Sequence, residues 1–187
     1  MGTDVWSGWS SKGSPAGGCT SAPGADWRST TELFIFCRGS AGNTNAAVWY
    51  RQWNGSTNLW SAWTILDSGA AVSVTAPGAT DYFQPGDTWH LNVYAKQGTA
   101  SSPTVKQNYK STGGFLGWNL PVGGLGGTCA SAPNASDLPI TPFYLYVFCR
   151  WDPGPNSPSS AWDGGIYYRR WDNTNWGVWT SLGLHAP

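Results

Sequence analysis

The chain has 187 residues, including 14 tryptophans, 25 glycines and 13 prolines, but only 11% of its residues are charged and its formal net charge is zero. This composition argues against a helical protein, because helices favour Ala, Leu, Glu, Lys and Arg and the chain has Glu32 as its only glutamate. So much aromatic surface also argues against disorder, and the absence of basic runs argues against nucleic-acid binding.

Short β-strands are predicted along the whole chain. Leu33–Cys37 and Val48–Trp53 come first, because both are rich in aromatic and β-branched residues and are bounded by Gly, Asn and Ser turns. No window shows a convincing helical period. The later predicted strands are, in chain order, 60–66, 91–95, 105–109, 115–118, 145–149, 166–172 and 176–182.

The predicted strands belong to an internal repeat. Cys19-Thr-Ser-Ala-Pro23 recurs as Cys129-Ala-Ser-Ala-Pro133, and Leu33-Phe-Ile-Phe-Cys-Arg38 recurs as Leu145-Tyr-Val-Phe-Cys-Arg150. A degenerate middle copy contains Ser73-Val-Thr-Ala-Pro77. We therefore predict a single domain over residues 1–187, with four-stranded repeats at about 6–59, 60–114 and 115–175 and a closing strand at 176–183.

The middle copy indicates how the cysteines pair. It has Ser73 and Ala95 where the outer copies have cysteine, so both cysteines of a copy are absent together. The joint absence of two cysteines from one repeat is typical of a pair that forms a disulfide. We therefore predict the bonds Cys19–Cys37 and Cys129–Cys149. The alternative is four buried reduced thiols. Disulfides would indicate an oxidising or extracellular location.

A four-stranded unit with Trp and Gly markers is typical of a β-propeller blade. Propellers have about 4–8 blades, so three repeats need a second chain, and a dimer would give six. The closing strand is of the kind that completes a ring by strand exchange. The alternative all-β fold is a β-trefoil, which closes within one chain.

The repeated motifs resemble the blades of PLL-type β-propeller lectins of bacteria and fungi. The similarity is carried by Trp60-Ser-Ala-Trp-Thr-Ile-Leu66, Val48-Trp-Tyr-Arg-Gln-Trp-Asn54 and their later copies, and covers most of residues 6–66 and 115–183. There is a looser likeness to small fucose-binding propellers assembled from short chains. The resemblance implies fucose, GlcNAc or O-methylated sugars as ligands. The cysteine pairs, the longer repeats and the missing arginine strand of the middle copy depart from that pattern.

Sugar recognition needs an apolar plate for the C–H face of the ring and polar groups for its hydroxyls. Tryptophan, Arg, Gln and Asn occur together at repeated positions of this chain, as pockets between repeats would require. Any of these tryptophans could instead be a spacer packed inside the sheet. The candidate sugar-binding residues are Trp6, Trp9, Arg51, Gln52, Trp53, Trp60, Trp63, Arg169, Arg170, Trp171, Trp176 and Trp179.

Catalysis is not predicted. A glycosidase needs two carboxylates roughly 5–10 Å apart, and here the pair would have to come from aspartates, none of which is expected to lie in a repeated context. His90 and His185 are solitary, so no metal site, nucleophile or cofactor is expected. Asp172-Asn-Thr-Asn-Trp176 is only faintly similar to the Asp-box of sialidase propellers.

The sequence thus predicts a multivalent lectin that forms a homo-oligomer, expected to be a dimer, and that has glycans as partners. No nucleic acid and no membrane insertion are expected, since the longest apolar stretch is residues 143–149. Residues 1–25 show no export signal, and secretion is expected from the disulfides alone. The alternatives are a glycan-active enzyme, of the glycosidase or sialidase-like propeller kind, and a structural propeller that binds other proteins.

Overall fold

The structure is a computed structural model that describes most of the chain. As predicted, its described part is all-β, and no helix occurs in it. Trp6 and Trp9 lie outside the described residues, so the structure does not place these two candidate sugar-binding residues. The described residues are 11–41, 45–66, 75–83, 89–99, 102–111, 113–118, 120–121, 128–129, 131–138, 144–152, 165–172 and 174–183.

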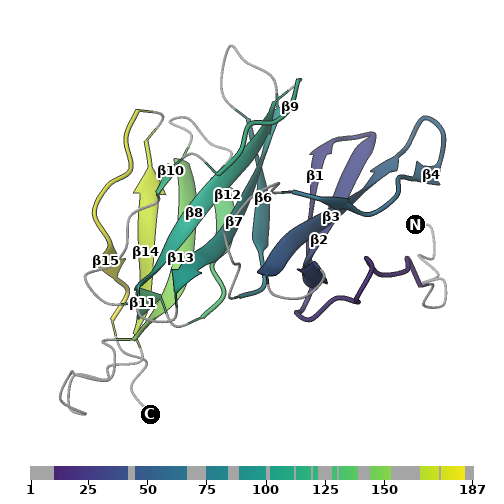
Figure 1. The fold of residues 1–187 in the computed structure, drawn as a ribbon. Helices are drawn as coiled ribbons and strands as arrows, with labels where there is room; N and C mark the ends of the chain where they lie inside the picture. The colour runs from purple at the N-terminus through teal and green to yellow at the C-terminus, as the bar shows by residue number, and fades with distance from the viewer. Residues whose placement is uncertain are drawn as a thin grey trace, which may run out of the picture.

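The strands form three antiparallel sheets, which lie side by side in Figure 1. Sheet 1 contains β1 (Gly24–Ser29), β2 (Glu32–Ala41), β3 (Asn45–Asn54), β4 (Leu59–Trp60) and β5 (Thr64–Ile65). Sheet 2 contains β6 (Gly78–Phe83), β7 (Trp89–Thr99), β8 (Ser102–Ser111), β9 (Gly114–Phe115) and β10 (Leu120–Pro121). Sheet 3 contains β11 (Thr128–Cys129), β12 (Asn134–Leu138), β13 (Tyr144–Asp152), β14 (Ile166–Trp171) and β15 (Thr180–Ser181).

The register shows that the three sheets are built alike. Leu33 pairs with Trp53, Leu91 with Lys110 and Leu145 with Trp171. After the third long strand of each sheet (β3, β8 and β14), the chain turns back and an aromatic residue pairs with that strand. Trp60 opposes Trp53, Phe115 opposes Lys110 and Trp176 opposes Trp171. The strands that open the second and third predicted repeats are therefore paired with the sheet before them, and β15 of the predicted closing strand pairs with β14.

Successive side chains of a strand point to opposite faces of its sheet, and in the central strands β2, β7 and β13 apolar side chains occur on both faces. Phe34 and Phe36 point to one face of sheet 1, where they are fully buried against Leu91 and Val93 of sheet 2. Tyr94 lies on the opposite face of sheet 2 and packs in the same manner against sheet 3. The core therefore consists of two layers, one between sheets 1 and 2 and one between sheets 2 and 3.

Two glycines let the first strands of neighbouring sheets approach closely. A Cβ at Gly24 would lie 2.6 Å from the carbonyl oxygen of Pro77, and a Cβ at Gly78 would lie 2.4 Å from that of Pro133. No side chain fits at such distances, so glycine is required at both positions. Strand β6 consequently contacts β1 on one side and β12 on the other.

Both predicted disulfides are present, with Cα–Cα distances of 5.7 Å for Cys19–Cys37 and 5.8 Å for Cys129–Cys149. The described residues contain no free cysteine, so the alternative of reduced thiols is not what the structure contains. Two disulfides are compatible with an extracellular location. The repeated Ser-Ala-Pro motif lies beside them, and Ser21 Oγ accepts the backbone N–H of Arg38 at 3.0 Å, as Ser131 Oγ does from Arg150.

Candidate functional site

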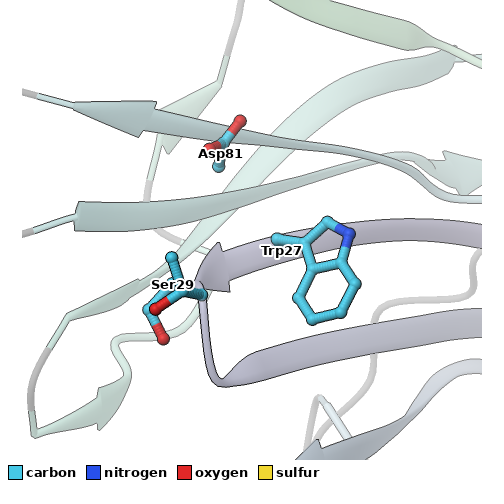
Figure 2. A pocket seen from close by; sticks show the side chains of 4 residues that line it. Trp27, Ser29 and Asp81 are labelled. Atoms are coloured by element: carbon cyan, nitrogen blue, oxygen red, sulfur yellow. The ribbon is translucent and has the colours of Figure 1, made fainter. Parts of the chain in front are cut away.

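A cavity of about 490 Å³ opens between the first strands of sheets 1 and 2. It is lined by Trp27, Ser29, Thr30 and Asp81, and Figure 2 shows Trp27 and Asp81 on separate strands. Trp27 and Ser29 belong to β1, Thr30 to the turn that follows, and Asp81 to β6. The cavity thus combines an indole ring, two hydroxyls and a carboxyl group.

The indole of Trp27 is accessible and firmly supported. It is 44% exposed, and its ring meets that of Trp53 nearly at right angles, with 5.7 Å between the ring centroids. Trp53 is itself held in place, because its Nε1 donates a hydrogen bond of 3.1 Å to Oδ1 of Asn58. An exposed aromatic plate on a fixed support is suited to stacking with an apolar ligand surface.

Asp26 ties together the two strands that form the cavity. Its Oδ1 accepts the backbone N–H of Trp27 at 2.8 Å, and its Oδ2 accepts the backbone N–H of Asp81 at 2.9 Å. One carboxylate therefore sets the spacing between the Trp27 and Asp81 backbones. These bonds use the carboxylate as an acceptor, which favours its ionised form.

The carboxyl groups near the cavity influence one another. Burial, together with the negative charges of Asp26 and Asp137, raises the pKa of Asp81 to about 6. Burial likewise raises the pKa of Asp26 and of Asp137. Asp81 therefore changes charge in mildly acidic solution: it accepts hydrogen bonds when ionised and can donate one when protonated. Among the described residues, no group of His, Cys, Asp and Glu is arranged to hold a metal ion.

The predicted sugar-binding residues of the first repeat lie on both faces of sheet 1. Arg51, Trp53 and Trp60 share the face that has no neighbouring sheet in the described structure, and the Arg51 guanidinium lies 5.9 Å from the Trp60 ring centroid. Gln52 lies on the opposite face and donates a 2.7 Å hydrogen bond from Nε2 to Oε1 of Glu32. Trp63 is half-buried. Among the described residues of this set, Trp53 is the one that contacts a lining residue of the cavity, Trp27.

Three predicted tryptophans of the last repeat, Trp171, Trp176 and Trp179, pack against the core layer between sheets 2 and 3. Trp171 and Trp176 are in contact, with 5.7 Å between their ring centroids. Arg170 lies on the other face, with its guanidinium 4.5 Å from the centroid of Tyr144. This packing favours a structural role for the three tryptophans, and their role toward a sugar stays a prediction.

The repeated arginine holds the outer strand of its sheet. Arg51 Nε donates to the carbonyl oxygen of Ser61, and Arg169 Nε donates to that of Gly177, which is the equivalent residue. In the middle sheet the equivalent Asn108 accepts the backbone N–H of Gly117 at 3.0 Å. All three side chains thus fix the segment that follows the third strand. This shared role explains why a polar residue recurs at this position.

Sequence reasoning missed the two principal cavity residues. Trp27 has no tryptophan at the equivalent position of the other repeats, so the repeat pattern did not identify it as a candidate. Asp81 and Asp137 do lie in a repeated context, contrary to the expectation for the aspartates, because Pro77-Gly-Ala-Thr-Asp81 and Pro133-Asn-Ala-Ser-Asp137 match. They also occupy the same register position, since they pair with Leu91 and Leu145. This repeated Pro-x-Ala-Thr/Ser-Asp motif was the signal that could have identified them.

The described residues contain no helix long and apolar enough to cross a membrane. Comparison of the chain with family models, with curated proteins and with solved structures gave no match.

Proposed function

We propose that this protein is a secreted, multivalent lectin without catalytic activity, and that its three sheets are blades of a β-propeller. A second copy of the chain would complete the ring to six blades. The ligands are neutral glycans, and the resemblance to propeller lectins favours fucose, GlcNAc or O-methylated sugars. The observation that carries the glycan-binding proposal is the cavity in which an exposed Trp27 lies beside hydroxyl and carboxyl groups.

The chemistry of the cavity fits a sugar ring. Trp27 offers an apolar plate for a C–H face, whereas Ser29, Thr30 and Asp81 offer donors and acceptors for hydroxyls. An anionic ligand is disfavoured, because the carboxylates of Asp26 and Asp81 repel anions and none of the described lining residues is a lysine or arginine. If several blades each bind weakly, multivalency raises the avidity by roughly 100–10,000-fold.

The sheet topology favours a propeller over the trefoil. Each sheet is a separate antiparallel meander, and the described strands form no barrel. The first strands of successive sheets also lie next to one another, as β1, β6 and β12 do. This is the arrangement expected where blades surround a common axis.

The second candidate is a glycan-active enzyme, and it rests on Asp81. A carboxyl with a pKa of about 6 beside ionised Asp26 has the properties of a general acid with a neighbouring base. Release of reducing sugar that disappears in Asp81→Asn would favour this candidate.

The test is a glycan array of neutral oligosaccharides, followed by calorimetric titration of the best ligand. Trp27→Ala should weaken binding at least about tenfold, because it removes the stacking plate that aromatic contacts of this kind depend on. Leu116→Ala is the control, since Leu116 is similarly exposed at 46% and does not line the cavity. Absence of any glycan ligand, or undiminished binding by Trp27→Ala, would refute the proposed site.

A further inference from the structure

Three rings on one face of sheet 1 form a compact group. Phe34 and Phe36 of β2 have ring centroids 6.2 Å apart with planes 15° apart, and Tyr50 of β3 lies 6.1 Å from Phe34 and 6.3 Å from Phe36. Sheet 2 covers this group with Phe115, whose centroid is 6.0 Å from Phe34 and 4.9 Å from Tyr50. These rings therefore form part of the interface between sheets 1 and 2.

Sheet 3 carries the same group at equivalent positions. Tyr146 and Phe148 of β13 have centroids 6.1 Å apart with planes 19° apart, and Tyr168 of β14 lies 5.8 Å from Tyr146 and 6.3 Å from Phe148. The distances match those in sheet 1 within a few tenths of an ångström. No ring from a neighbouring sheet covers this second group in the part of the chain that the structure describes.

The face of sheet 3 is consequently open where that of sheet 1 is closed. Val48 is fully buried, whereas the equivalent Ile166 is 43% exposed, and Leu66 is 9% exposed whereas the equivalent Leu182 is 60% exposed. The open face holds a groove of about 360 Å³ lined by Leu138, Tyr146, Phe148, Tyr168 and Leu182. An apolar surface of this extent at the end of a series of stacked sheets is typical of an interaction site.

The opposite end of the series has the complementary face. Leu91 and Val93 of sheet 2 are fully buried against sheet 1, but the equivalent residues of sheet 1, Leu33 and Ile35, are only half-buried. This face presents Trp60 at the position that Phe115 occupies in sheet 2. Trp176 of sheet 3 also occupies that position, and it contacts Tyr94 of sheet 2 with 6.3 Å between ring centroids.

We propose that sheet 3 of one copy docks onto sheet 1 of a second copy, with Trp60 of the second copy covering Tyr146, Phe148 and Tyr168. The two faces differ, so the contact is heterologous, and two copies close a ring when each makes it with the other. This inference rests on the blade arrangement proposed above, and Trp27, which pairs with Leu33, lies on the same face of sheet 1 as Trp60. It specifies which faces meet and which ring fills the groove.

The junction between copies differs from those within the chain in two respects. Gly24 and Gly78 allow close approach of the first strands, but the equivalent residue of sheet 3 is Asn134, whose side chain is exposed. The first strands must therefore be further apart at this junction, and the ring groups supply the contact. Lys12 lies 5.8 Å from the Trp60 ring centroid, so docking displaces this lysine from the ring.

Light scattering of the intact protein at micromolar concentration tests the proposal. We expect twice the chain mass of 20.0 kDa. Tyr168→Asp and Trp60→Asp should each give single chains. Each substitution is present in both copies of a dimer, so it places a carboxylate in both contacts between the copies. Val178→Asp is the control, since Val178 is 81% exposed and lies in neither interface. Circular dichroism of each variant verifies that it is folded.

Mixing the two variants provides a sharper test. A chain with Tyr168→Asp retains Trp60, and a chain with Trp60→Asp retains Tyr168, so the mixture can form one intact junction. Association in the mixture but not in either variant alone is expected only for a heterologous contact. Single chains of the unaltered protein, dimers that both variants preserve, or open-ended assemblies would each overturn the proposal. Glycan titration of the Tyr168→Asp monomer separates this outcome from failure of the lectin proposal.

Discussion

Replacing Gly78 with alanine should force β6 and β12 apart. The added Cβ would lie 2.4 Å from the carbonyl oxygen of Pro133 and 3.2 Å from Cα of Asn134. Both atoms belong to backbone, so no side chain can rotate away to make room. Ordinary contacts between such atoms are roughly 3.5 Å long, and the strands must therefore separate by about 1 Å.

The cost can be worked from this displacement. Overpacking that shifts backbone costs about 1–3 kcal/mol, and alanine regains about 0.4–1 kcal/mol by restricting the unfolded chain. The backbone of Gly78 is not in the left-handed region, so no conformational strain adds to the loss. We expect the free energy of unfolding to fall by about 1–2 kcal/mol. For a domain of this size, each 1 kcal/mol corresponds to about 2–4 °C in Tm.

Urea denaturation and thermal melting measure this loss. Gly113→Ala is the matched control, because a Cβ there meets no atom within 4 Å and the backbone is not left-handed. That variant should stay within about 0.5 kcal/mol of the unaltered protein. If Gly78→Ala were as stable as Gly113→Ala, the close approach of β6 and β12 would be wrong, and with it the way the sheets are joined.

Two further predictions concern the disulfides and Asp81. The double variant Cys19→Ser, Cys37→Ser should lose about 3 kcal/mol of stability in urea denaturation, because the bond closes a loop across a sequence separation of 18 residues; unchanged stability would contradict a structural role for this bond. For Asp81, the folded state binds the proton more tightly than the unfolded chain, since burial and the charges of Asp26 and Asp137 together raise the pKa from 3.8 to about 6. Ionisation of Asp81 therefore opposes folding, and stability falls as the pH rises from about 4 to about 6. The variant Asp81→Asn should show a smaller decline and should be more stable than the unaltered protein at neutral pH. Urea denaturation across this pH range measures the difference. If the pH dependence of stability were the same in both proteins, ionisation of Asp81 would not be its cause.

Local pattern was sufficient to predict the strands and the disulfides. Leu33-Phe-Ile-Phe-Cys37 is a short continuous run of aromatic and β-branched residues with the length of a strand, and its Phe34 and Phe36 face sheet 2 while Leu33 and Ile35 are only half-buried. The joint absence of both cysteines from the middle copy identified the pairs. Such features depend on residues close in sequence or at fixed repeat positions, so the sequence alone determined the all-β class and Cys19–Cys37.

The cavity and the burial of the individual tryptophans were decided only by the tertiary structure. Trp27 and Asp81 are far apart in the chain and line one cavity because β1 and β6 pack closely through Gly24 and Pro77. Trp60 and Trp176 occupy the same motif, yet Trp176 packs in the core layer while Trp60 lies on a face without a neighbouring sheet. A repeat assigns equal positions to such residues, but burial depends on whether another sheet lies against them, and only the packing of whole sheets determines that.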